Sequence, residues 1–99
     1  MIKHLEKVEE FEKEIQGELT LVDFYADWCG PCKMLAPELE QLEKETGIKI
    51  IKINVDELSL LARQFRIMTI PTLMLFKDGQ LVKRESAYMP VAALKDFIK

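Results

Sequence analysis

The sequence predicts an α/β domain built on a mixed five-stranded central sheet with four flanking helices. Two features carry this prediction. Over the first two thirds of the chain, strand-like and helix-like apolar patterns alternate, which is typical of parallel strands joined by right-handed helical crossovers. The pattern then changes to two adjacent strands around Lys77-Asp78-Gly79-Gln80, and an Asp-Gly pair between strands strongly indicates an antiparallel hairpin.

The first half of the chain contains two predicted strands and two predicted helices. A short strand covers residues 2–5, and an almost wholly apolar one covers residues 19–26 (LTLVDFYA), as in a central strand covered on both faces. Between them, a helix that ends near Gly17 is indicated by apolar residues at helical spacing: Val8, Phe11 and Ile15. A long helix over residues 29–46 follows and ends at Gly47; its apolar stripe consists of Leu35, Leu39 and Leu42.

The second half begins with a β-branched strand over residues 48–55. A third helix comes next, with Asp56 as its expected N-cap and an apolar stripe of Leu58, Leu61, Ala62 and Phe65. The hairpin strands cover residues 72–76 and 81–85. The last helix has Pro90 in its first turn, and its apolar residues are Val91, Leu94, Phe97 and Ile98.

Length and composition indicate one domain over residues 1–99. Apolar residues make up 48% of the chain, enough for a core without metal or disulfide cross-links. The net charge of −3 and the absence of any long Lys or Arg run argue against nucleic acid or an anionic membrane as a partner. No apolar run is long enough to span a bilayer, and the charged N-terminus lacks the apolar stretch of a signal peptide. We expect a monomer in the reducing cytoplasm.

The two cysteines, Cys29 and Cys32, lie where the central strand turns into the long helix. The unpaired N–H groups and the dipole at a helix N-terminus favour a thiolate at Cys29. Cys32 is three residues further on the same face, so the two sulfurs can reach bonding distance, and Pro31 suits an early helical position. Two other interpretations are a pair of buried apolar thiols and a metal site. A metal site needs about four ligands, and His4 is the only histidine, so we expect no metal.

Asp23 interrupts the apolar strand six residues before Cys29. A carboxyl group in a central strand is expected to be buried, and burial raises its pKa. Close to a thiol pair, such a group is a candidate proton acceptor for Cys32. The alternative is an aspartate at a strand end that faces solvent. Lys52 lies in the middle of the neighbouring strand and is a candidate partner of Asp23, although such a lysine more often extends outward into water.

The segment Ile70-Pro71-Thr72 opens the first hairpin strand. Proline within a sheet is confined to edges, strand starts and bulges. It either ends a loop here or forms a cis peptide bond beside the cysteines, and we expect the Ile70–Pro71 bond to be cis.

These motifs together carry a family resemblance. Residues 21–33 read LVDFYADWCGPCK, and Trp-Cys-Gly-Pro-Cys with Ile-Pro-Thr at this separation is a specific combination. Further matches are Pro37, Lys52, Asn54, Phe65 and Lys77-Asp78-Gly79. The chain resembles the bacterial thioredoxin family over essentially its full length.

The resemblance implies a thioredoxin fold and a protein that reduces disulfides in target proteins through a reversible Cys29–Cys32 disulfide. It implies no bound cofactor, with electrons supplied from NADPH by a flavoprotein, thioredoxin reductase. Cys29, as the more exposed cysteine at the helix end, is expected to attack the target, and Cys32 to resolve the mixed disulfide. The residues expected to contact a target are Trp28, Gly30, Pro31, Ile70, Pro71 and Ala87.

Two positions depart from the family pattern. Tyr25 stands where many members have Trp, and Ser86-Ala87-Tyr88 replaces the more usual Val-Gly-Ala, which adds a methyl group where a partner backbone approaches. A related oxidant or isomerase is the nearest alternative activity, and Gly30-Pro31 favours the reductant by resemblance. A third possibility is a non-catalytic binding subunit that holds a partner on Trp28, Met68 and Ile70.

Overall fold

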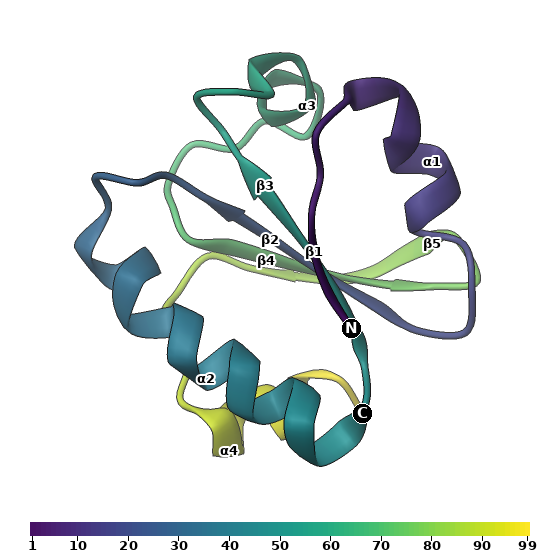
Figure 1. The fold of residues 1–99 in the computed structure, drawn as a ribbon, viewed down its shortest axis with the longest axis vertical. Helices are drawn as coiled ribbons and strands as arrows, with labels where there is room; N and C mark the ends of the chain where they lie inside the picture. Colours follow the sequence, from purple (N-terminus) through teal and green to yellow (C-terminus); the bar gives the residue numbers. More distant parts are fainter.

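A computed structural model describes residues 1–99 and confirms the predicted architecture (Figure 1). Five strands form one mixed sheet in the order β1-β3-β2-β4-β5. β1, β3 and β2 are parallel, whereas β4 is antiparallel to both β2 and β5. The strands are β1 (Ile2–His4), β2 (Thr20–Tyr25), β3 (Lys49–Asn54), β4 (Thr72–Lys77) and β5 (Gln80–Glu85). The helices are the 3-10 turn η1 (Val8–Glu10), α1 (Phe11–Glu14), α2 (Gly30–Thr46), α3 (Ser59–Gln64) and α4 (Val91–Phe97).

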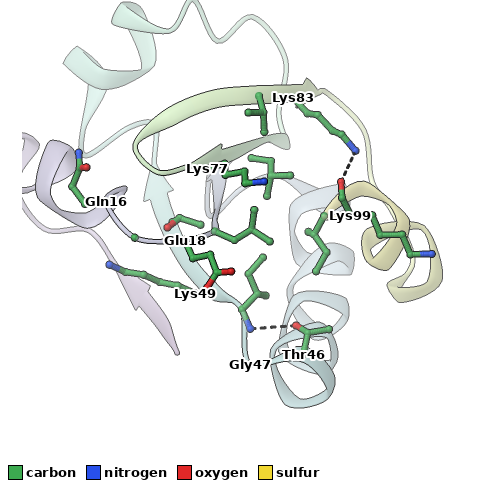
Figure 2. A pocket seen from close by; sticks show the side chains of 15 residues that line it. Gln16, Glu18, Thr46, Gly47, Lys49, Lys77, Lys83 and Lys99 are labelled. Carbon is green, nitrogen blue, oxygen red and sulfur yellow. Dashed lines mark hydrogen bonds between the residues drawn. The ribbon is translucent and has the colours of Figure 1, made fainter.

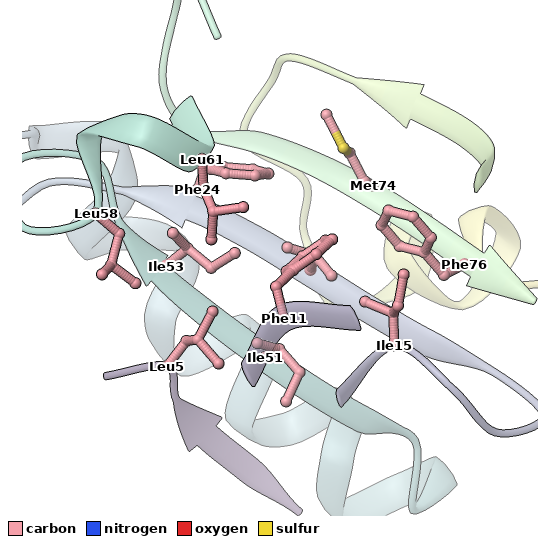
Figure 3. Close-up of a cluster of buried hydrophobic side chains, with 11 residues drawn as sticks. Leu5, Phe11, Ile15, Phe24, Ile51, Ile53, Leu58, Leu61, Met74 and Phe76 are labelled. Atoms are coloured by element: carbon pink, nitrogen blue, oxygen red, sulfur yellow. The ribbon is translucent and has the colours of Figure 1, made fainter. Parts of the chain in front are cut away.

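The helices cover both faces of the sheet, with α1 and α3 on one side and α2 and α4 on the other (Figure 1). Successive residues of β2 point to opposite faces, so Val22 and Phe24 enter one apolar cluster while Leu21 enters the other. Figure 3 shows the first cluster, in which side chains of α1 and α3 meet those of β2, β3 and β4. This double burial is why the central strands are apolar almost throughout.

The turn between β4 and β5 fits the hairpin prediction. Asp78 and Gly79 both have positive φ, 51° and 82°, as a two-residue turn of type I′ requires. Gly47 adopts a left-handed φ of 71° and ends α2, as predicted.

The expected cap of the third helix is wrong. α3 begins only at Ser59, its N-cap position is Leu58, and no side chain caps it. The Asn54 side chain accepts the backbone N–H groups of Asp56 and Glu57 at 2.9 and 3.3 Å, which forms a turn before the helix starts. The Asp56 carboxylate is therefore free for another partner, described below.

Other helix limits shift by a few residues. The first helix is a 3-10 turn followed by four residues of α-helix and ends at Glu14, before Gly17. Cys29 and Pro90 are not inside their helices but occupy the N-cap positions of α2 and α4.

Glu14 anchors α1 to the sheet through Lys3 of β1 and Lys49 of β3, and Lys49 Nζ lies 2.9 Å from Glu14 Oε1. Hydrogen bonds from Lys3 and then Lys49 lower the pKa of Glu14 from 4.5 to about 2. Its ionised form thus stabilises the fold above pH 4.5, and this contribution is lost as pH falls towards 2.

Glu14→Gln is therefore expected to lower the free energy of unfolding by about 1 kcal/mol at pH 7 and by much less near pH 2. Urea denaturation at the two pH values measures this difference. Glu12→Gln, at an exposed position in the same helix, is the control and should change stability little. An equal loss for Glu14→Gln at both pH values would contradict the ion-pair argument.

Candidate active site

The two cysteines lie at the N-terminus of α2, and the structure joins them in a disulfide. Cys29 is the N-cap residue, and its sulfur accepts the backbone N–H of Cys32 at 3.2 Å. Gly30 and Pro31 form the first helical positions, so the Cα atoms of the two cysteines are only 5.2 Å apart. A thiolate at Cys29 would meet that N–H and the positive end of the α2 dipole, and both favour the anion.

The expected difference in exposure between the cysteines is wrong for this disulfide form, because each is only 4% exposed. Cys29 is covered from a segment distant in the sequence: its sulfur lies 3.8 Å from the carbonyl oxygen of Ile70. Ala26 completes the buried cluster with the two cysteines, and Tyr25 packs against it.

The predicted cis bond is present between Ile70 and Pro71. Ile70, two residues before the start of β4, is the residue whose carbonyl oxygen lies beside Cys29. Thr72 Oγ1 and Ser86 Oγ lie 2.9 Å apart, which ties the segment that carries Ala87 to the same region.

Exposed residues lie next to the two cysteines in the chain and in the segments joined to the Ile70 region, and we call them the rim of the site. Trp28 is 70% exposed and Met68 88% exposed, and Gly30, Pro31 and Ala87 are also on the surface. The indole Nε1 of Trp28 donates to Asp56 at 2.9 Å, so the ring is held in place although it is open to solvent. Sequence reasoning missed this bond because it assigned Asp56 to a helix cap.

Asp23 is fully buried, as predicted, and neither of its carboxyl oxygens has a hydrogen-bond partner. Burial raises the pKa of Asp23 to about 6, and the positive charge of Lys52 opposes that rise. Lys52 Nζ lies 3.8 Å from Asp23 Oδ2, and its side chain is only 12% exposed. Of the two orientations considered for Lys52, the structure therefore has the one that faces Asp23.

A small cavity of about 170 Å³ lies beside Lys52. Cys32 and Lys52 line it together with Tyr25 and Asp27. Lys52 therefore faces Asp23 and also shares a cavity with Cys32.

A larger cleft of about 710 Å³ lies at the opposite end of the sheet, where β2 and β3 begin (Figure 2). Apolar residues such as Leu19 and Ile98 line it, with Lys77 and Lys83 among the polar ones. The Lys83 ammonium in this cleft already donates to the carbonyl oxygens of Phe97 and Lys99. Neither cysteine lines this cleft.

Comparison with known proteins decides the family. The sequence model of the family described as Thioredoxin matches residues 2–99. The chain belongs to the thioredoxin family. A thioredoxin of Bacillus subtilis (strain 168) is 44% identical over 89% of this chain and 86% of its own length. One from Staphylococcus saprophyticus is 45% identical over 90% of this chain and 88% of its own.

Solved thioredoxin structures agree with the fold. A mutant thioredoxin from Halobacterium salinarum NRC-1 superposes with a TM-score of 0.91 at 39% identity, covering 98% of this chain and 87% of that one. Oxidised mitochondrial thioredoxin 3 from Saccharomyces cerevisiae gives a TM-score of 0.89 at 36% identity, with 98% and 92% coverage.

This thioredoxin-family protein is a dithiol–disulfide oxidoreductase with Cys29 and Cys32 as its redox-active pair. The family implies disulfide-containing targets and a reductase in general. The non-catalytic binding subunit is not favoured. No helix is long and apolar enough to cross a membrane, and no three potential metal ligands lie together.

Proposed function

We propose that the protein reduces disulfides in other proteins, with Cys29 as the attacking thiolate and Cys32 as the resolving thiol. The position of the Cys29 sulfur carries this proposal. As the N-cap of α2 it accepts the N–H of Cys32 and stands within bonding reach of the Cys32 sulfur.

The reaction transfers two electrons in two exchanges. The Cys29 thiolate attacks one sulfur of the target disulfide, forms a mixed disulfide and releases the other target sulfur as a thiolate. Cys32 then loses its proton and attacks Cys29 Sγ, which releases the second target thiolate and forms the Cys29–Cys32 disulfide. The target is thereby reduced and the cysteine pair oxidised.

Asp23 is the proton acceptor for Cys32 in this scheme. With a pKa near 6 it is ionised at neutral pH, yet it holds a proton more readily than an exposed carboxylate does. Lys52 is its electrostatic partner at 3.8 Å.

The rim of the site is the proposed target-binding surface. The backbone of Ile70, whose carbonyl oxygen lies 3.8 Å from the Cys29 sulfur, is the edge with which an extended target segment is expected to pair, as in strand addition. Trp28, just before the N-cap of α2, and Gly30 and Pro31, in the first turn of α2, are the exposed residues next to the cysteines in the chain. Ala87 follows Ser86, which lies 2.9 Å from Thr72 Oγ1, and its methyl group is expected to influence the choice of partner.

The electrons that restore the dithiol come from NADPH through a flavoprotein, thioredoxin reductase. We further propose that residues 1–99 fold as one domain and that the protein acts as a cytoplasmic monomer, consistent with its mixed surface charge.

A coupled assay tests this function. NADPH oxidation is followed with a thioredoxin reductase, this protein and a disulfide-bonded test protein. Turnover should require all three proteins and should vanish in the Cys29→Ser/Cys32→Ser double variant. A double variant that lost turnover but still bound the target proteins and changed their activity would support the binding role instead.

A further inference from the structure

Four polar side chains lie in a row on the face of the sheet that α2 covers. His4 on β1 is in register with Lys52 on β3, and Lys52 is in register with Asp23 on β2. Neighbours in register share a face, and Tyr25 shares it too because it is two residues beyond Asp23. The pairing of three strands thus aligns side chains from distant parts of the sequence.

Their contacts form a continuous chain. The His4 Nδ1 and Tyr25 hydroxyl oxygen are 3.1 Å apart, and the two rings meet edge to face, with centroids 5.9 Å apart. The Lys52 ammonium lies over the tyrosine ring, 4.8 Å from its centroid, within the range of a cation–π interaction. The same ammonium faces Asp23 Oδ2.

We propose that Tyr25 is a positioning residue that holds the Lys52 ammonium beside the Asp23 carboxyl group, and that His4 fixes the tyrosine ring. The proposal deepens the proposed function, because it rests on Asp23 as the proton acceptor in disulfide exchange.

The distance between Lys52 and Asp23 is the reason a positioning residue is needed. At 3.8 Å the two groups do not form a close hydrogen bond, and no other group donates to the carboxyl oxygens. A lysine side chain is flexible, and the cavity of about 170 Å³ beside Lys52 gives the ammonium room to move. The tyrosine ring limits that motion, since it attracts the ammonium that lies over it at 4.8 Å from the ring centroid.

The other charged groups around the tyrosine leave it neutral at working pH. Burial, followed by the negative charges of Asp27 and Glu57, raises the pKa of Tyr25. The phenol therefore keeps its proton and can donate it in a hydrogen bond to His4 Nδ1. Asp27 also lines the cavity beside Lys52, so it is a competing site for the ammonium if the ring is removed.

Removal of the ring is expected to raise the pKa of Asp23, because the opposing charge moves away. The variants are Tyr25→Leu, Lys52→Met and the double variant, and the pKa is read from the Asp23 carboxyl carbon by NMR titration of the oxidised protein. Tyr25→Leu should raise the pKa by about half a pH unit and Lys52→Met by about one or more. In the Lys52→Met background, the tyrosine substitution should add almost nothing.

Two milder variants test the role of His4. Tyr25→Phe and His4→Ala each remove the same hydrogen bond while leaving an aromatic ring under Lys52, so each should raise the pKa less than Tyr25→Leu does. Tyr88→Leu, the only other tyrosine position, is the matched control and should leave the pKa unchanged.

An unchanged pKa in Tyr25→Leu overturns the proposal. An equal shift with and without Lys52 also overturns it, because the ring would then act by burial alone. Neither readout depends on turnover. A separate measurement tests the proton-acceptor role: that role fails if the Asp23→Asn variant resolves mixed disulfides as fast as the parent protein. The positioning of Lys52 by Tyr25 is tested independently, by the pKa titrations above.

Discussion

Replacing Cys32 by serine is expected to trap target proteins on Cys29 as stable mixed disulfides. The first exchange needs only the Cys29 thiolate, which the Cys32 backbone N–H and the α2 N-terminus stabilise. The second exchange needs a sulfur at position 32, so turnover should fall on the order of a thousandfold while covalent complexes accumulate. Non-reducing electrophoresis and mass spectrometry of the reduced variant mixed with a disulfide-bonded test protein measure this.

Cys29→Ser is the matched control, because it removes one sulfur from the same pair. It should lose turnover to the same extent but form no adduct, since Cys32 lacks the N-cap position that favours the thiolate at Cys29. If Cys29→Ser accumulated adducts and Cys32→Ser did not, the roles of the two cysteines would be reversed.

The sequence was sufficient to predict the sheet, the helices and the burial of Asp23, because these depend on local patterns. An apolar run such as residues 19–26 is typical of a strand covered on both faces, and a carboxyl group inside such a strand is expected to be buried, as the structure shows for Asp23. The Asp-Gly turn likewise fixes its own conformation through the positive φ at both positions.

The errors arise where several local options compete. Asp56 has the right residue type for a helix cap, but Asn54 accepts the nearby N–H groups first and the helix starts later. Position along α2 suggested an exposed Cys29, whereas Ile70, more than forty residues away in the chain, covers it.

The sequence predicted Asp23 as the partner of Lys52, but not the contacts of Tyr25 with Lys52 and His4, because these depend on register between distant strands. β1 has only three residues, and a shift by one residue would turn His4 to the other face of the sheet. The Lys52 ammonium lies over the Tyr25 ring as well as facing Asp23, and the spacing of residues along the chain does not predict the contact with the ring.

Replacing Asp23 by alanine is expected to stabilise the protein at neutral pH. The folded pKa of about 6 lies above the ordinary value of 3.8, so the unfolded chain releases this proton first as pH rises. The contribution of Asp23 to the free energy of unfolding is therefore most favourable below pH 3.8 and declines between pH 3.8 and 6. Above pH 6 it is less favourable by on the order of 3 kcal/mol. The truncated side chain loses some packing, so a net gain of about 1–2 kcal/mol is expected at pH 7.

Denaturant unfolding at pH 4 and pH 7 separates this effect from a general change in packing. The gain of Asp23→Ala should be present at pH 7 and absent or reversed at pH 4, where the parent carboxyl group is protonated in the fold. Asp27→Ala, at an exposed position beside the active site, should change stability by about 0.5 kcal/mol or less at either pH. A gain of equal size at both pH values would rule out ionisation of a buried Asp23 as its source.

The same variant should be slow in one step of the exchange only. Without the carboxylate, Cys32 must give its proton to water, so resolution of a preformed mixed disulfide should slow by about a hundredfold at pH 7. The attack by Cys29 precedes that proton transfer and should keep its rate. In the parent protein the resolution rate should rise with pH through about 6, as Asp23 ionises, and this rise should be missing in the variant. Stopped-flow measurement of the two steps across pH 5–8 tests both points. Equal slowing of both steps, or a pH dependence that survives the substitution, would assign the proton transfer to another group. Asp23 would then lower the stability of the fold without taking part in catalysis.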